Sequence, residues 1–185
     1  GVHKDWMSYC EELIEKYVGP RKNKIKIVAG GEDRNGTIMN IIKDIEENYK
    51  NVKESIIITH DAVRPFVSLK IIEENIEAVI TYGACDTVIP ATDTIVKSEN
   101  GKDISEIPNR KFLYQGQTPQ SFRIEILKEL YSKISEADKK ELTDACKICV
   151  MNGKNVKLVN GDTLNIKITT INDYTIAQAI LSQEG

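Results

Sequence analysis

The stretch that decides the fold is Ile56-Ile57-Ile58-Thr59-His60-Asp61-Ala62-Val63-Arg64-Pro65-Phe66. Its β-branched run has no polar break, which is typical of a strand buried on both faces of a parallel sheet. Pro65 prevents a simple continuation of that strand. Because open α/β sheets bind ligands at the carboxyl ends of their strands, Asp61 is a candidate for binding a nucleotide and its metal ion. An aspartate in this position can equally cap the next turn, so the fragment alone leaves both interpretations open.

The composition indicates an ordinary soluble domain. The chain has 185 residues, of which 41% are hydrophobic and 29% charged, enough for one domain with a continuous core. Acidic and basic residues are mixed along the sequence and give a net charge of −3, so no basic face predicts a nucleic-acid partner. No apolar run approaches the roughly 20 residues of a membrane span. No signal peptide is visible, and we therefore expect a cytoplasmic protein with no membrane partner.

The four cysteines do not predict a metal or redox site. Cys146 and Cys149 form a Cys-x-x-Cys inside a predicted helix, whereas a redox motif normally opens a helix after a strand. A structural zinc site usually needs four ligands, and the only histidines are His3 and His60. We expect these two cysteines, with Cys10 and Cys85, to be buried and free.

Predicted strands and helices alternate along most of the chain. Three successive strand–helix units imply a parallel sheet with right-handed crossovers. After them, Asn100-Gly101 favours a hairpin turn, and the block around it is expected to leave the sheet. Ser68, Ser135 and Thr170 are expected to cap helices. The expected strands are 25–29, 56–59, 87–89, 94–96, 104–107, 112–115, 156–159 and 165–168, and the expected helices carry residues 6–17, 38–45, 71–80, 124–133, 136 onward, 143–152 and 176–181.

Gly30-Gly31 follows the first expected strand, where doubly wound nucleotide-binding domains often place a phosphate loop. The segment from Gly30 to Thr37 contains neither Gly-x-Gly-x-x-Gly nor Gly-Lys-Ser/Thr, so it is a weak triphosphate cradle. A plain strand-to-helix turn explains the two glycines equally well.

Six short motifs occur along the chain in one order. They are Gly30-Gly31-x-x-Arg34-x-x-Thr37, His60-Asp61-Ala62-Val63-Arg64-Pro65, Asp93-Thr94, Gln117-Thr118-Pro119-Gln120-x-Phe122, Thr143-Asp144 and Asn165-Ile166-Lys167-x-Thr169. Together they resemble the sugar-alcohol phosphate cytidylyltransferases, which include the methylerythritol phosphate enzymes of isoprenoid synthesis and the ribitol-5-phosphate enzymes of teichoic-acid and capsule synthesis. The segments 114–122 and 143–147 are more similar to the ribitol phosphate branch.

The resemblance implies an α/β fold. Family members have a Rossmann-like, mostly parallel sheet with helices on both faces and a protruding β-arm, here about residues 93–122, that crosses to a second subunit of a homodimer. The resemblance covers essentially all of residues 1–182, and we expect residues 1–185 to form a single nucleotidyltransferase domain. Relatives begin with a strand and a glycine-rich, basic loop that have no counterpart before Gly1, so we expect the domain to be N-terminally incomplete.

The resemblance also implies the chemistry: transfer of CMP from CTP to ribitol 5-phosphate, giving CDP-ribitol and pyrophosphate. Asp61 would hold Mg²⁺, for which one carboxylate plus phosphate oxygens is a suitable ligand set. Lys167 would stabilise the transition state, although it can also be a plain surface lysine. Arg64 can support the nucleotide or form an ion pair with a neighbouring carboxylate. The residues implied for CTP binding are Gly30, Gly31, Arg34, Thr37, Asp61, Ala62 and Arg64.

The acceptor phosphate is implied to bind across the dimer. Arg110 and Thr118 would reach the partner's site, where the planar fork of arginine suits a phosphate dianion. Thr94, Thr143 and Lys167 are further candidates, although Thr94 can be a plain strand residue and Thr143 a helix cap. Methylerythritol phosphate enzymes commonly have an acidic residue where this chain has Leu164, which puts a second metal-binding carboxylate in doubt. A methylerythritol phosphate acceptor, and a non-catalytic fragment that keeps the fold and the arm, remain as alternatives.

Overall fold

The computed structural model describes residues 1–183, which form two compact units. The first unit combines residues 1–57 with 123–154, and the second combines residues 58–122 with the chain from 155 onward. The chain has an α/β fold with a mixed sheet flanked by helices, as expected for the class. Each unit is described separately below.

The first unit is mainly helical. Apolar side chains at helical spacing, among them Ile38, Ile42, Leu127 and Ile148, are buried and form its core. The Ser135 hydroxyl accepts the Asp138 N–H, so the expected cap is confirmed. The α-helices are α1 (Met7–Tyr17), α2 (Arg34–Asn48), α4 (Ile124–Ser132), α5 (Glu136–Lys139) and α6 (Ala145–Met151), and the short 3₁₀ helices are η1 (Lys4–Trp6), η2 (Gly19–Lys24) and η3 (Val52–Glu54).

The strand expected at 25–29 is wrong. This segment makes a single parallel bridge, between Ala29 and Val2. The Val2 N–H donates to the Val28 carbonyl at 3.0 Å, and the Gly30 N–H donates to the Val2 carbonyl at 2.7 Å. The pairing stops there because the chain turns into η1 at Lys4, which leaves 25–28 without a partner strand among the described residues.

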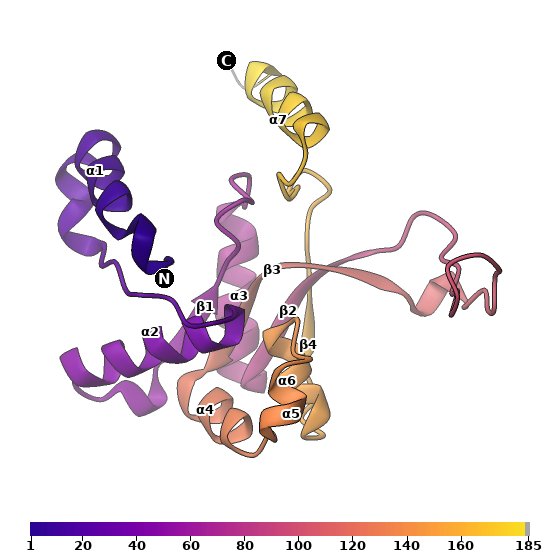
Figure 1. The fold of residues 1–185 in the computed structure, drawn as a ribbon, viewed down its shortest axis with the longest axis horizontal. Helices are drawn as coiled ribbons and strands as arrows, with labels where there is room; N and C mark the ends of the chain where they lie inside the picture. Colours follow the sequence, from indigo (N-terminus) through magenta and orange to yellow (C-terminus); the bar gives the residue numbers. More distant parts are fainter. Residues whose placement is uncertain (184–185) are drawn as a thin grey trace. The chain divides into compact units, whose positions relative to one another are not determined.

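The sheet has four strands in the order β1-β3-β2-β4. The strand expected at 56–59 is confirmed, and the one expected at 156–159 lies one residue further on. β2 pairs with β3 in antiparallel and with β4 in parallel orientation, so the sheet is mixed (Figure 1). The bounds are β1 (Ile56–Thr59), β2 (Ala84–Pro90), β3 (Tyr114–Arg123) and β4 (Lys157–Asn160).

Helix α3 (Leu69–Tyr82) packs against β2 and β4, and α7 (Ile171–Gln183) ends the described chain. Ser68 and Thr170 cap these helices as expected, accepting the N–H groups of Ile71 and Asp173. The buried face of α3 contains a polar residue, Asn75, which is fully buried.

Asn75 links α3 to the sheet through hydrogen bonds. Its amide donates to the Thr87 hydroxyl of β2 at 2.8 Å, and its Oδ1 accepts the Ser121 hydroxyl of β3 at 2.9 Å. The Thr87 hydroxyl in turn donates to the Pro119 carbonyl at 2.7 Å. Buried polar groups that are hydrogen-bonded in this way fix one arrangement of the elements that carry them.

Residues 91–113 connect β2 to β3 and extend away from the sheet of their own unit (Figure 1). The strands expected at 94–96 and 104–107 are reduced to one antiparallel bridge, between Lys97 and Glu106. Gly101 lies in the turn with φ of 71°, a conformation that glycine adopts easily. A short 3₁₀ helix, η4 (Arg110–Phe112), precedes β3. Large apolar side chains are exposed along this segment, namely Val96, Ile104, Ile107 and Phe112.

The cysteines are free, as expected. Cys85, Cys146 and Cys149 are buried, and Cys10 is half-buried. Burial raises the pKa of the Cys85 and Cys149 thiols to about 11. Between residues 1 and 183, no three histidine, cysteine or acidic side chains are grouped to hold a metal ion. No helix in the same range is both long and apolar enough to cross a membrane.

Candidate active site

The site is built around an irregularity in β3. Asp86 pairs with Gln120 and Val88 pairs with Gly116, so residues 117–119 lie opposite Thr87 alone. Such a β-bulge bends its strand and redirects side chains, and bulges are common beside active sites. Here Gln117 and Thr118 are directed toward two different loops.

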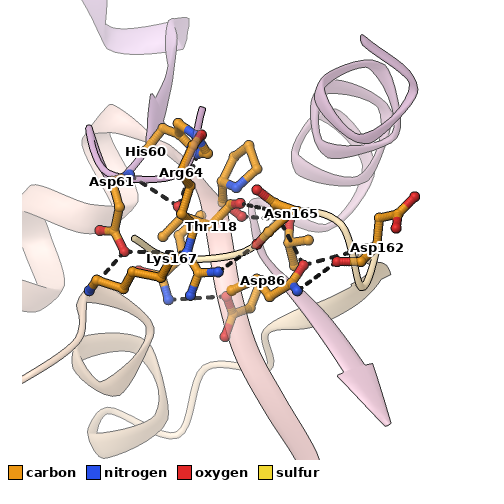
Figure 2. Close-up of polar contacts among 12 residues, drawn as sticks. His60, Asp61, Arg64, Asp86, Thr118, Asp162, Asn165 and Lys167 are labelled. Atoms are coloured by element: carbon orange, nitrogen blue, oxygen red, sulfur yellow. Dashed lines mark hydrogen bonds and ion pairs between the residues drawn. The ribbon is translucent and has the colours of Figure 1, made fainter. Parts of the chain in front are cut away.

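The first loop is the turn after β1, residues 60–64. The Asp61 N–H donates to the Thr118 hydroxyl at 3.0 Å, and that hydroxyl lies 2.9 Å from Nδ1 of His60. Nε2 of His60 lies 2.8 Å from the Arg64 carbonyl. A neutral imidazole with its hydrogen on Nε2 satisfies the whole chain, because Thr118 then donates to Nδ1 and Nε2 donates to Arg64. The turn is thereby tied to β3 immediately beside the Asp61 carboxylate (Figure 2).

The second loop is residues 161–168, where the strand expected at 165–168 is wrong. The Gln117 amide donates to the Asp162 carbonyl at 2.8 Å, and its Oε1 accepts the Asn165 amide at 3.2 Å. Asn165 is fully buried and also donates to the Thr118 carbonyl at 2.8 Å. Side-chain amides therefore provide the contacts that a neighbouring strand would otherwise provide.

The two loops also contact each other directly. The Arg64 guanidinium donates to the Asn165 carbonyl at 2.7 Å, and the Ile168 N–H donates to the Val63 carbonyl at 2.9 Å. These bonds lie on either side of Lys167 in the sequence. They fix the backbone from which the Lys167 side chain extends toward the first loop (Figure 2).

The charges converge on one carboxylate oxygen. Oδ2 of Asp61 lies 3.1 Å from Nζ of Lys167 and 3.5 Å from Nε of Arg64. The Arg64 side chain is 11% exposed and the Lys167 side chain 47% exposed. Arg64 is thus a fixed part of the site, whereas the Lys167 ammonium is near enough to solvent to contact a ligand. The ion pair that was one of two interpretations of Arg64 is present.

Of the other predicted acceptor residues, Thr118 lies at the site itself. It belongs to β3 and is only 4% exposed. Its hydroxyl is bonded to the His60 and Asp61 of its own chain. Thr94 and Arg110 are exposed on the connecting segment 91–113, and the Arg110 guanidinium donates to the Thr92 carbonyl.

The remaining predicted residues belong to the first unit. The Thr37 hydroxyl accepts the Gly31 N–H at 2.9 Å and closes the turn before α2. A Cβ on Gly31 would lie 2.6 Å from the Gly36 carbonyl carbon, so the close backbone approach requires glycine there. Thr143 is exposed, and it is Asp144 that caps α6, accepting the Cys146 N–H at 2.6 Å. Gly30 and Arg34 flank the same turn as Gly31, and Ala62 is exposed in the loop after β1.

Three residues of the site carried no predicted role: His60, Gln117 and Asn165. All three lie within the motifs quoted above, but those motifs predicted a role only for their neighbours Asp61, Thr118 and Lys167. The local pattern gives no signal for the burial of Asn165, because apolar and polar residues alternate from Leu164 to Ile168 and such alternation normally places the polar ones on an exposed face. The bulge that directs Gln117 has no local signal either.

The carboxylate fits a magnesium ion held mainly by substrate phosphates. Mg²⁺ is commonly bound by one or two carboxylates together with phosphate oxygens and water. Asp61 is partly exposed at the end of β1, where a phosphate chain can approach it. Leu164, which is 52% exposed, stands where methylerythritol phosphate enzymes commonly have an acidic residue. Its side chain has no oxygen, so it provides no second ligand for the metal.

Comparison with known proteins shows the family of this chain. The model of the family "IspD: 2-C-methyl-D-erythritol 4-phosphate cytidylyltransferase" matches residues 1–183. The chain belongs to the IspD family. A ribitol-5-phosphate cytidylyltransferase of Streptococcus pneumoniae serotype 2 (strain D39 / NCTC 7466) is 48% identical over 184 residues, which cover 100% of this chain and 78% of that protein.

Solved structures of the IspD family share the fold. The 4-diphosphocytidyl-2C-methyl-D-erythritol synthase of Anaerococcus prevotii DSM 20548 superposes with a TM-score of 0.78 at 27% identity, covering 97% of this chain and 78% of that one. The 2-C-methyl-D-erythritol 4-phosphate cytidylyltransferase of Francisella tularensis gives a TM-score of 0.75 at 27% identity, covering 84% of this chain and 71% of that one.

Proposed function

We propose that this protein is a cytidylyltransferase that transfers CMP from CTP to ribitol 5-phosphate, giving CDP-ribitol and pyrophosphate. The observation that carries the proposal is the Asp61–Lys167 pair, 3.1 Å apart at the end of β1, in a chain 48% identical to a ribitol-5-phosphate cytidylyltransferase. Phosphoryl transfer between anions requires positive charge, which the Lys167 ammonium would supply directly and the Asp61 carboxylate through a bound cation.

The proposed reaction is an in-line displacement. A phosphate oxygen of the acceptor attacks the α-phosphorus of CTP, and the bond from that phosphorus to the β-phosphate oxygen breaks as pyrophosphate leaves. Both reactants are anions, so the protein must mainly position them and neutralise negative charge. Lys167, which is half exposed, would contact the phosphates, while the buried Arg64 holds Asp61 in place.

Asp61 is the proposed ligand of Mg²⁺. When bound, the ion would neutralise charge on the triphosphate oxygens. The carboxylate is already ion-paired with Lys167, so the lysine would exchange its contact with Asp61 for one with a substrate phosphate. The residues proposed to contact CTP are Gly30, Gly31, Arg34, Thr37, Ala62 and Arg64.

The acceptor is proposed to bind with help from a second subunit. The connecting segment 91–113 carries exposed apolar side chains together with Arg110, which supports a homodimer whose partner covers this segment. Thr94 and Arg110 are the proposed phosphate contacts on it, and Thr118, Thr143 and Lys167 are further candidates. In this scheme the enzyme acts in the cytoplasm and supplies CDP-ribitol for teichoic acid or capsule synthesis.

Mixed dimers test the shared site. Arg110→Ala and Lys167→Ala are each expected to leave the full-length enzyme with only a small, measurable residual activity. If Arg110 acts in the partner's site, subunit exchange between the two variants forms dimers with one complete site and one site that lacks both residues. Activity should then return to part of the wild-type value. Mixtures as inactive as either parent would show that Arg110 does not act across the dimer.

The reaction itself is tested by its product. Full-length protein incubated with CTP, Mg²⁺ and ribitol 5-phosphate should release pyrophosphate and form CDP-ribitol, which mass spectrometry identifies. Reactions without the acceptor should release no pyrophosphate. Absence of CDP-ribitol in the complete mixture would overturn the proposal.

A further inference from the structure

We infer that Gln117 is a positioning residue of the proposed reaction, and that its side-chain amide holds Lys167 in place through the loop 161–168. The inference rests on the proposed function for its effect on turnover. The anchoring itself rests on geometry alone. Gln117 is 7% exposed and lies in the β3 bulge.

The Gln117 amide binds the loop at three points. Nε2 donates to the Asp162 carbonyl at 2.8 Å, while Oε1 accepts the Asp162 N–H at 3.3 Å and the Asn165 side-chain amide at 3.2 Å. The amide thus pairs with the Asp162 peptide as a neighbouring strand would. Because an unpaired polar group is costly to bury, these three hydrogen bonds stabilise the loop in this position.

Gly161 provides the room for this amide. A Cβ at Gly161 would lie 2.4 Å from Oε1 of Gln117 and 3.1 Å from Cγ2 of Thr87. The Gly161 N–H also donates to the Val88 carbonyl at 2.8 Å, which fixes the start of the loop on β2. Gly161 and Gln117 therefore form one close contact, which can be disturbed from either side.

Asn165 links the Gln117 amide to the backbone that carries Lys167. Asn165 is held by Gln117 and by the Thr118 carbonyl, and its own carbonyl accepts the Arg64 guanidinium. Two residues further on, Lys167 reaches Asp61 at 3.1 Å. A lysine side chain is flexible, so its reach depends on where its backbone is fixed. A displacement of about 1 Å in a reacting group can lower a rate by about 100-fold.

The substitution Gln117→Leu keeps approximate size and removes all three hydrogen bonds. Gln115→Leu is the matched control, because Gln115 lies in the same strand, is exposed and makes no side-chain hydrogen bond in the described structure. Gly161→Ala is a second variant that displaces the Gln117 amide from the opposite side. All three are compared in the full-length protein at a temperature where each is folded by circular dichroism.

Two readouts separate anchoring from catalysis. Backbone hydrogen exchange, followed by mass spectrometry, should become faster in 161–168 for Gln117→Leu and Gly161→Ala but not for Gln115→Leu. The kcat should fall on the order of 10- to 100-fold with KM for CTP nearly unchanged. In a Lys167→Ala background, Gln117→Leu should have little further effect on kcat, because the group that it positions is already gone.

Each outcome is decisive. Unchanged exchange in 161–168 overturns the anchoring, whatever the activity. Faster exchange with unchanged kcat, or an equal further loss in the Lys167→Ala background, shows that Gln117 is structural and does not position Lys167. If the wild-type protein does not turn over CTP, the proposed function fails and only the anchoring, read from exchange, stands.

Discussion

The two loops that bring Asp61 and Lys167 together are held in different ways. The turn 60–64 directly follows a strand of the sheet and closes on itself, with the Arg64 N–H donating to the Asp61 carbonyl at 3.0 Å. The loop 161–168 follows β4 but contains no strand, and the amides of Gln117 and Asn165 hold it. The side chain of the first turn that reaches β3 is the exposed His60, whereas the amides that hold the second loop are buried, so substitutions of these side chains should affect the two loops differently.

This difference matters for catalysis because the loops carry opposite charges. The carboxylate of Asp61 lies on the turn after β1, and the ammonium of Lys167 lies on the loop that buried amides hold. The position of the anion should therefore resist substitution of its neighbours. The position of the cation should depend on a few amides.

Asp61→Ala is expected to have the largest effect on activity. It removes the carboxylate where the proposed metal binds and toward which Lys167 and Arg64 are directed. The loss should be several kcal/mol of transition-state stabilisation, or on the order of 1,000-fold in kcat. The turn should persist, because the Asp61 backbone N–H still reaches Thr118. Steady-state pyrophosphate release measures the effect, and near-normal turnover would refute the assignment of Asp61.

Asn165→Leu is expected to have the largest effect on stability. It leaves the Thr118 carbonyl and Oε1 of Gln117 without the amide that now donates to both. The free energy of unfolding should fall by about 1–3 kcal/mol. Asn160→Leu is the matched control, since Asn160 is exposed in β4, and it should change stability little. Urea denaturation gives both values, and equal losses in the two variants would contradict a side-chain-held loop.

His60→Ala is expected to have the smallest effect of the three. It removes the link from Thr118 to the Arg64 carbonyl, but the backbone bonds of the turn remain. His60 is exposed, so water can replace its contacts, and we expect a loss of about 0.5–1 kcal/mol. The same urea titration tests this value. If His60→Ala lowered the free energy of unfolding more than Asn165→Leu does, the first turn would depend on its side chains more than the second loop, contrary to our expectation.

The sequence predicted the regular parts of this molecule well. The β-branched run of β1, the cap of α3 at Ser68 and the cap of α7 at Thr170 follow from local patterns, and the structure confirms them. The Asp61 and Lys167 motifs also lie together, although the strand expected around Lys167 is absent. Such patterns predict hydrogen bonds between residues close in the sequence. They also predict which side chains of an element share one buried face.

The irregular parts could not be predicted, for a physical reason. The bulge of three residues opposite Thr87 depends on pairing between strands far apart in the chain, and no local pattern encodes it. The bulge places Thr118 beside Asp61 of its own chain rather than on a protruding arm. Asn75 likewise occupies a helical position that periodicity assigns to an apolar residue, and its role appears only when Thr87 and Ser121 lie beside it.

The most direct test of the proposed function is the acceptor preference of the full-length enzyme. Pyrophosphate release from CTP is measured with ribitol 5-phosphate and with 2-C-methyl-D-erythritol 4-phosphate, each over a range of concentrations. A site built to hydrogen-bond the hydroxyls of a linear pentitol leaves buried groups unpaired when a methylated analogue binds. We expect kcat/KM to favour ribitol 5-phosphate by at least about 100-fold, roughly 2.7 kcal/mol. A preference for the methylerythritol acceptor would contradict the proposed substrate.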